Sequence, residues 1–228
     1  GAHLLAIQGQ AEIFYFECLG NSDKVMTRTD TGIKTAADLK GKTIAAVLGT
    51  SSEALLNLTL QSAGLTQSDV KIVSMDQNGA ATALIAGQVD AAAIWSPLTV
   101  TVSDTLGDKA VVVSSIGDFA DKAPSPGSWI TSAKMIKEHP EVIEALTKAF
   151  LKASNFRAAN IEKTAEYVAR LIGTDTSEVM KEVQTAKWFT ADEIYEFVTN
   201  GSVDGWYSAE QQMFIDAGQL AEKVPNET

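Results

Sequence analysis

Hydrophobic and polar positions along the first half of the chain predict strands and helices in turn. Residues 3–8 are typical of a helix tail ending at Gly9, and the aromatic run 11–19 alternates in the way that favours a strand. Apolar runs predict further strands at 24–30, 43–48, 70–75, 89–95 and 109–116. Expected helices at 36–39, over the leucines of 55–60, and at 79–86 lie between them. This alternation predicts an α/β fold with a mainly parallel sheet and helices on both faces.

The second half of the chain changes to a mostly helical pattern. Prolines 124 and 126 with Gly127 mark a connection, and 129–131 predict a strand leading away from the first sheet. Pro140 suits the first position of a helix, and further helices are expected at 162–172, 177–187 and 191–199. Capping boxes at Thr190/Glu193 and Ser208/Gln211 predict the starts of the last two helices, the final one running to about 217. The helix after Pro140 carries an apolar stripe of Val142, Ile143, Leu146, Ala149, Phe150, Ala153 and Phe156.

These patterns divide the chain into three parts. An α/β segment at 36–124 is flanked by a short α/β piece, 1–35, and a long helical piece, 125–228. A segment inserted in this way predicts that the two flanks form one lobe and the insertion a second lobe. The chain would then cross between the lobes near 27–35 and again near 124–130.

Composition narrows the class of protein. The 228 residues are 45% hydrophobic and 21% charged, as in ordinary globular proteins, and the formal net charge is −11. That charge argues against nucleic acid and anionic membrane surfaces as partners, although a local nest of N–H groups can still hold a small anion. The start of the chain has no basic segment typical of a signal peptide, and we expect a cytoplasmic protein or a processed or trimmed one.

The stretch "TIAAVLGTSSEALLNL", residues 43–58, places Gly49 and three hydroxyl residues where a strand passes into a helix. One interpretation is capping, because Thr50 and Glu53 fit the S/T-x-x-E box in which each side chain satisfies a free backbone N–H. The other is anion binding, since the N–H groups and positive dipole end of a helix attract negative charge. The residues alone leave both open, and capping is the more common use of this pattern.

Four stretches carry a resemblance to a known family: "TGIKTAADLKGKTIA", "GTSSE", "ALIAGQVDAAAIWSP" and "KMIKEHPEVIEALTKAFLKAS". In this order they resemble the periplasmic solute-binding proteins of ABC importers, in particular the nitrate, sulfonate and taurine group. The resemblance implies a two-lobed α/β clamshell of type II. It also implies a monomer outside the cytoplasm, in the periplasm or on the cell surface as a lipoprotein, that closes on a small organic anion and delivers it to membrane permease subunits.

One departure from the family is large. Members usually begin with two βαβ-type units before the point that matches residue 1, which at about 30 residues each amounts to roughly 60 residues. We therefore expect the first lobe to lack its N-terminal strands and to show an exposed sheet edge.

The resemblance also assigns ligand contacts. It implies that the loop of Gly49, Thr50, Ser51 and Ser52 faces the cleft, with Ser52 standing where some relatives carry histidine. Trp95 and Trp129 are further candidates, each with core packing as the alternative. Taurine-type relatives carry an aspartate at the position of Gly127, so its absence weakens the case for a ligand amine. Asp76 or Asn78 is expected to cap the helix at 79–86, and Asn78 fits a cap better than a contact.

Catalytic and metal-binding patterns are absent from the sequence. It has no G-x-S-x-G elbow and no P-loop, and Cys18, His3 and His139 form no dyad or metal-ligand spacing. Asp90, Trp188 and Trp206 are interpreted as structural. The prediction is therefore a binding protein without catalytic residues, metal or cofactor. Two alternatives stay open: a clamshell enzyme of the menaquinone or thiamine-pyrimidine type, although the latter uses a cysteine-rich motif missing here, or a sensory ligand-binding module.

Overall fold

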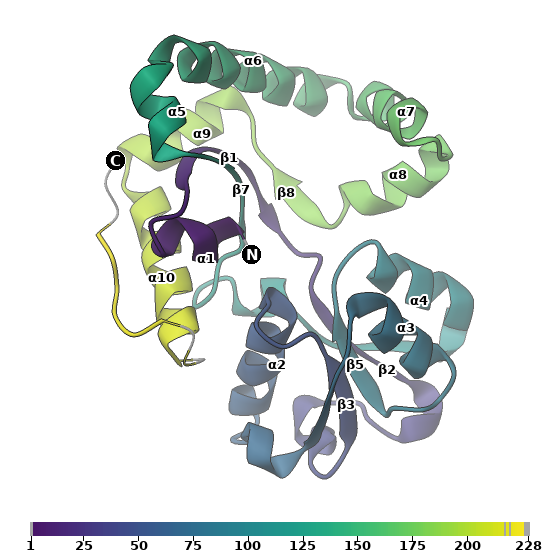
Figure 1. Cartoon of the computed structure of the whole chain (residues 1–228). Coiled ribbons are helices and arrows are strands. Elements are labelled where there is room, and N and C mark those ends of the chain that lie inside the picture. Colours follow the sequence, from purple (N-terminus) through teal and green to yellow (C-terminus); the bar gives the residue numbers. More distant parts are fainter. Residues whose placement is uncertain (1, 217, 219, 226–228) are drawn as a thin grey trace. The chain divides into compact units, whose positions relative to one another are not determined.

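The computed structural model describes residues 2–216, 218 and 220–225, without the side chains of residues 2, 4 and 5 (Figure 1). They form two compact units. Unit 1 comprises Gly1–Gly20, Pro124–Gln212 and Glu222–Thr228, and unit 2 comprises Asn21–Ala123 and Met213–Ala221.

Unit 2 contains a five-stranded sheet of order β4-β3-β5-β2-β6. The strands are β2 (Lys24–Arg28), β3 (Thr43–Ala46), β4 (Lys71–Ser74), β5 (Ala91–Ile94) and β6 (Ala110–Ser115), and the α-helices are α2 (Ser51–Ser62), α3 (Gln77–Ile85) and α4 (Leu98–Leu106). Short 3-10 helices occupy Thr29–Thr31, Ala36–Leu39, Gln67–Asp69, Gly107–Lys109 and Ile116–Phe119. β3 pairs with β4 and β5 in parallel, whereas β2 pairs with β5 and β6 antiparallel. The expectation of a mainly parallel sheet is confirmed for β3, β4, β5 and β6, which run in one direction, whereas β2 enters the sheet in the opposite direction and makes it mixed.

Each central strand of unit 2 places alternate side chains on opposite faces of the sheet. In β3, Ile44 packs with the leucines of α2, and Ala45 packs with α3 on the other face. Met26 of β2 and Ile94 of β5 join Ala45, and all three are fully buried. The period of two in a strand gives both faces an apolar layer, so helices cover the sheet on both sides (Figure 1).

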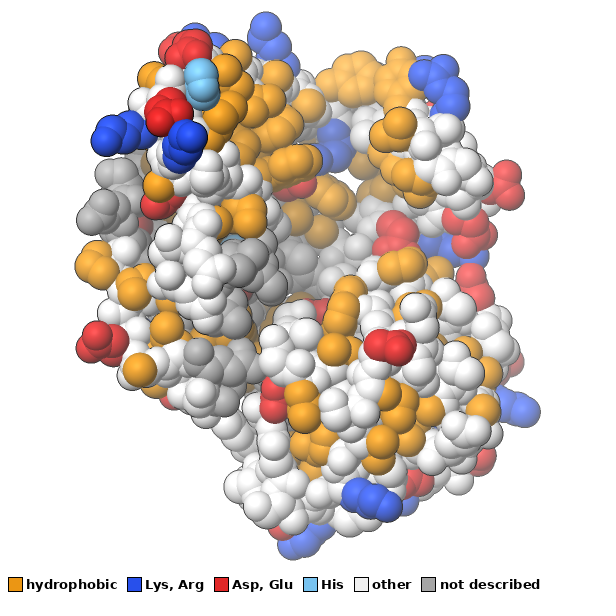
Figure 2. All heavy atoms as spheres, viewed as in Figure 1, with side chains coloured by type: hydrophobic (Ala, Val, Ile, Leu, Met, Phe, Trp, Pro, Cys, Tyr) orange, Lys and Arg blue, Asp and Glu red, His pale blue; other side chains and the backbone are white. Residues whose placement is uncertain are grey.

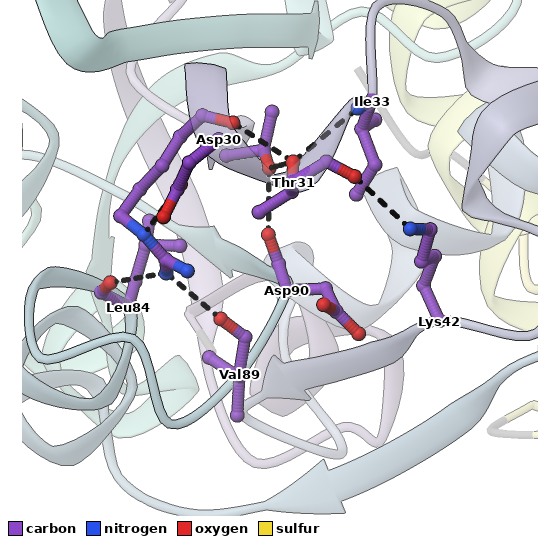
Figure 3. Close-up of polar contacts among 9 residues, drawn as sticks. Asp30, Thr31, Ile33, Lys42, Leu84, Val89 and Asp90 are labelled. Atoms are coloured by element: carbon purple, nitrogen blue, oxygen red, sulfur yellow. Dashed lines mark hydrogen bonds and ion pairs between the residues drawn. The ribbon is translucent and has the colours of Figure 1, made fainter.

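A polar network holds the amino end of β5 (Figure 3). The Asp90 carboxylate accepts the Thr43 N–H at 2.8 Å, and the Asp90 carbonyl accepts the Thr27 hydroxyl at 2.6 Å. The Arg28 guanidinium donates to the carbonyls of Leu84 and Val89 at 2.7 and 3.0 Å. These bonds tie β2, β3 and the end of α3 together, so Asp90 has a structural role, as its sequence context indicates.

Unit 1 contains a three-stranded antiparallel sheet of order β7-β1-β8, with β7 and β8 at its edges. Its strands are β1 (Glu12–Gly20), β7 (Pro126–Thr131) and β8 (Ala186–Trp188). Its helices are α1 (Ala2–Ile7), α5 (Ala133–Glu138), α6 (Pro140–Ala159), α7 (Ile161–Ile172), α8 (Thr176–Val183) and α9 (Ala191–Thr199), together with most of α10 (Ser202–Asp216).

The core of unit 1 is aromatic. Phe16 of β1 and Phe189 meet Trp206 of α10 at ring-centroid distances of 5.9 Å. Trp188 lies under the Arg157 guanidinium at 4.3 Å, and both tryptophans pack as expected. The stripe of α6 is only partly covered, since Val142, Leu146 and Phe156 are exposed. Hydrophobic side chains gather in patches on the surface (Figure 2). Further exposed apolar side chains lie on α7 and α9: Tyr167, Val168, Leu171, Ile172, Tyr195 and Val198.

Three helix and strand predictions differ from the structure. The expected helix 177–187 ends at Val183, because Ala186–Trp188 leave it to pair with Cys18–Gly20 as β8. The expected helix start at Ser208 is wrong, since α10 begins at Ser202 and includes Ser208 and Gln211. Its predicted end near 217 lies outside the described residues. The run "LTVTV" that follows Pro97 forms α4, which had no counterpart among the predictions.

Candidate functional site

The carboxyl ends of three parallel strands form one edge of the unit 2 sheet. β3 lies between β4 and β5, with Ala46 opposite Ser74 and Ala45 opposite Ala92. The chain leaves these strands directly into α2, α3 and α4, so the amino ends of all three helices follow the same edge. Open α/β sheets bind ligands at such an edge, and exposed N–H groups of helix starts favour negative charge there.

The start of α2 is capped by its own side chains. Gly49 has a left-handed φ of 76°, which turns the chain from β3 into the helix. The Thr50 hydroxyl accepts the Ser52 N–H at 3.3 Å, and the Glu53 carboxylate accepts the Gly49 N–H at 2.7 Å. Each side chain thus satisfies a backbone N–H as predicted, but the bonds are shifted by one residue from the expected box.

The two serines of this loop differ in their exposure. Ser52 is fully buried, and its hydroxyl contacts Val47, accepting the N–H at 3.3 Å. Ser51 is half-buried, and its hydroxyl is hydrogen-bonded to the Asp23 carboxyl. Of the four predicted contacts, Gly49 is exposed and Thr50 and Ser51 are half-buried, whereas Ser52 is buried and serves the loop itself.

Asp23 is a site residue that sequence reasoning missed. It comes directly before β2, whose first residue Lys24 lies opposite Ile94 at the end of β5, so Asp23 belongs to the same edge. The residue is 5% exposed, and burial raises the pKa of its carboxyl to about 6, against the lowering effect of the hydrogen bond from Ser51. Asp23 could have been identified only by recognising that the strand after it lies antiparallel to β5 in the sheet.

Trp95 and Asn78 also follow this edge. Trp95 comes directly after β5 and is half-buried, and its carbonyl accepts the Gln77 side chain at 2.7 Å. Asn78 lies in the first turn of α3, but the cap of that helix is Asp76, whose carboxylate accepts the Gly79 N–H at 2.8 Å. Of the two expected caps, Asp76 is confirmed and Asn78 is not, and Asn78 remains a predicted contact.

Trp129 belongs to unit 1. Its ring lies 4.7 Å from Phe150 between centroids and is 45% exposed, and its indole N–H donates to Glu17 at 3.1 Å. Two residues earlier, Gly127 lies directly opposite Cys18 in the β1–β7 pair. A side chain at position 127 would collide with the Cys18 sulfur. Burial raises the pKa of the Cys18 thiol to about 11, so this thiol stays protonated near neutral pH.

The described part of the chain contains no group of three His, Cys, Asp or Glu side chains placed to hold a metal ion. None of its described helices combines the length and the apolar composition that a membrane span requires.

The family model described as "NMT1/THI5 like" matches residues 20–164, which is more than half of the sequence. The chain belongs to this family. A Brucella abortus protein named as a binding protein is 33% identical over 96% of this chain and 68% of its own length. The taurine-binding periplasmic protein of Escherichia coli is 26% identical over 71% of this chain and 51% of its own length.

Solved structures show the same fold. The periplasmic aliphatic sulphonate binding protein SsuA of Escherichia coli has a TM-score of 0.72 at 20% identity, covering 97% of this chain and 70% of SsuA. The desulfurization enzyme DSZB, solved as a variant in complex with biphenyl-2-sulfinic acid, has a TM-score of 0.73 at 19% identity. The match covers 98% of this chain and 79% of DSZB. The resemblance to periplasmic binding proteins and their α/β fold is therefore confirmed, and the fold is shared with an enzyme.

Proposed function

We propose that this NMT1/THI5-like chain is the solute-binding component of an ABC importer and binds a small organic anion of the sulfonate type. Its location would be outside the cytoplasm, with lipid anchoring as a further prediction, and its solute would pass to membrane permease subunits. The similarity to the taurine-binding protein supports the class of solute. The observation that carries the proposal is the convergence of three helix starts at one edge of the unit 2 sheet.

The acidic group of the solute would lie at the start of α2. There the partly exposed Ser51 offers a backbone N–H, and its hydroxyl would turn from the Asp23 carboxyl to the solute. The helix dipole favours negative charge at the same place. Trp95, at the end of β5, provides an aromatic face for the organic part of the solute. Hydroxyl and amide donors with one aromatic surface match a sulfonate with a short carbon chain.

Replacing Ser51 by alanine tests the proposal. Loss of one hydroxyl contact should weaken the binding of taurine or an alkanesulfonate about three- to tenfold, the equivalent of a hydrogen bond of 0.5–1.5 kcal/mol, with a smaller effect on unfolding. Isothermal titration calorimetry measures the affinity and thermal unfolding the stability. The matched control is Ser52→Ala, which should mainly lower stability because Ser52 is fully buried. Absence of any response to sulfonates, with a clear response to a neutral or cationic solute, overturns the solute class.

Glu53 should limit the affinity for anions. Its carboxylate already accepts the Gly49 N–H beside the start of α2, so its negative charge opposes an anion there. Glu53→Gln keeps an acceptor for that N–H but removes the charge, so we expect sulfonate binding to tighten by a few-fold, the equivalent of roughly 0.3–1 kcal/mol. Calorimetry at low and high salt checks the cause, because a charge effect shrinks as ionic strength rises. Equal sulfonate affinity of the natural chain and Glu53→Gln at low salt would contradict this prediction.

Two features of the chain support binding rather than catalysis, although DSZB shares the fold. The chain has one cysteine, Cys18, and its buried thiol with a raised pKa is a poor nucleophile. The histidines His3 and His139 both belong to unit 1, whereas the start of α2 belongs to unit 2. We therefore propose that the site holds its solute without converting it.

A further inference from the structure

A cavity of about 520 Å³ lies within unit 1, and none of its lining residues belongs to the sheet edge described above. Residues of α1, β1, α6, α9 and α10 line it, together with Val224 and Pro225. Its size falls in the range of sites for small organic molecules. Because every lining residue belongs to unit 1, the cavity is a property of that unit alone.

The lining is aromatic and acidic. Phe14, Tyr15 and Phe16 of β1 contribute to it, with Tyr195 of α9 and Tyr207 of α10. Its ionisable carboxyl groups are Glu12, Asp204 and Glu210, and its one basic group is His3. Aromatic faces and an excess of carboxylates both attract cations, the former through the ring quadrupole.

Glu210 is the group in this lining that most needs a partner. The residue is 7% exposed, and one carboxylate oxygen lies 2.5 Å from His3 Nδ1. The other oxygen, Oε2, is buried and has no hydrogen-bond partner among the described residues. A buried carboxylate oxygen without a donor is unfavourable, and a donor on a bound molecule would remove that cost.

We propose that this cavity binds a small organic cation: an ammonium group on a compact aromatic or branched apolar body. The ammonium would donate to Glu210, and the apolar body would lie against the tyrosine and phenylalanine rings. Anions of the same shape are disfavoured by the carboxylates. This site is independent of the proposed sulfonate site, which lies in unit 2.

The test uses two probes of similar shape and opposite charge, 2-phenylethylammonium and 3-phenylpropionate, titrated into the 228-residue chain by calorimetry and followed by thermal unfolding. We expect saturable binding of the ammonium compound and at least tenfold weaker binding of the carboxylate. Equal binding of the two probes overturns the proposal. So does the absence of a response to the ammonium compound at about 10 mM in folded protein, since even weak sites reach millimolar affinity.

Two variants locate the binding. Glu210→Gln keeps the shape and an acceptor for His3, so the chain should fold, and we expect at least tenfold weaker binding of the ammonium compound. Ala6→Phe places a ring in the cavity, where Ala6 is a lining residue, and should abolish binding. The matched control is Ala133→Phe on the exposed start of α5, which should leave binding unchanged.

The remaining outcomes are also decisive. Ammonium binding that survives both Glu210→Gln and Ala6→Phe places the probe elsewhere and overturns the proposal. The alternative occupant is a protein segment, because Tyr195 and Val198 at this cavity are 72% and 50% exposed. Self-association of the chain that Ala6→Phe prevents, without binding of the ammonium compound, would favour that alternative. Sulfonate titrations of the same samples report separately on the unit 2 site.

Discussion

Gly127→Ala should lower the free energy of unfolding by about 1–3 kcal/mol, the range for overpacking a filled interior. Gly127 of β7 lies directly opposite Cys18 of β1 in the antiparallel pair. A Cβ at position 127 would lie well inside the contact distance of the Cys18 sulfur, and the thiol cannot move freely because Cys18 is buried. Urea or thermal unfolding of the purified variant measures the loss.

A double-mutant cycle separates this collision from other effects of the added methyl group. In the Cys18→Ala background the sulfur is gone, so Gly127→Ala should cost much less than in the natural sequence. The single Cys18→Ala variant serves as the reference, since deletion of a buried atom has its own cost. If Gly127→Ala destabilises both backgrounds equally, steric conflict with Cys18 is not the reason for glycine here.

The contact between position 127 and Cys18 also limits which residue can replace Gly127. Taurine-type relatives are expected to carry an aspartate at the position of Gly127, and the structure leaves no space for one while Cys18 stands opposite. Residues 18 and 127 are therefore coupled: a carboxylate at 127 requires a smaller residue at 18. The aspartate that taurine-type relatives are expected to carry therefore has no space at position 127 of this chain.

Short sequence patterns correctly predicted those helices and strands whose limits depend on neighbouring residues in the chain. The passage from β3 through Gly49 and Thr50 into α2, the Pro140 start of α6 and the Thr190/Glu193 capping box of α9 are all confirmed. β8 could not be predicted this way, because three residues become a strand only by pairing with β1, more than 160 positions away. The alternating "LTVTV" of α4 is typical of a strand. Its buried residues, Thr99 and Val102, are nevertheless at helical spacing. Packing against α3 therefore overrides the strand propensity of this run.

The candidate site was only partly predictable for the same reason. The hydroxyl loop at 49–52 follows a strand and precedes a helix, so its place at a sheet edge could be inferred from the sequence. Which hydroxyls are buried depends on side-chain direction in the first turn of α2, which the pattern does not determine. Predicting Asp23 requires further information, because Asp23 lies beside Ser51 only as a result of the direction in which β2 enters the sheet. The sequence pattern therefore predicts the loop at 49–52, whereas its acidic neighbour Asp23 is found only from the topology of the sheet.

Asp23→Asn should raise the stability of the chain at neutral pH and remove a pH dependence between about 4 and 6. The folded-state pKa of Asp23 is raised from 3.8 to about 6, chiefly by burial. The folded protein therefore binds more protons than the unfolded chain in this interval, and stability falls as pH rises through it and stays lower above it. About two pKa units correspond to roughly 3 kcal/mol. Asparagine is neutral and still offers an oxygen to the Ser51 hydroxyl, so the variant escapes this loss.

Unfolding curves of the natural chain and of Asp23→Asn at pH values from 2 to 8 measure the difference, and the contributions of the other titrating groups are the same in the two proteins. Asp38→Asn is the matched control of opposite sign. Hydrogen bonds from the Lys34 and Thr35 N–H groups lower the pKa of Asp38, so its contribution is present at neutral pH and is lost on acidification. A parallel pH dependence of the natural chain and Asp23→Asn would mean that Asp23 is not held in a desolvated position.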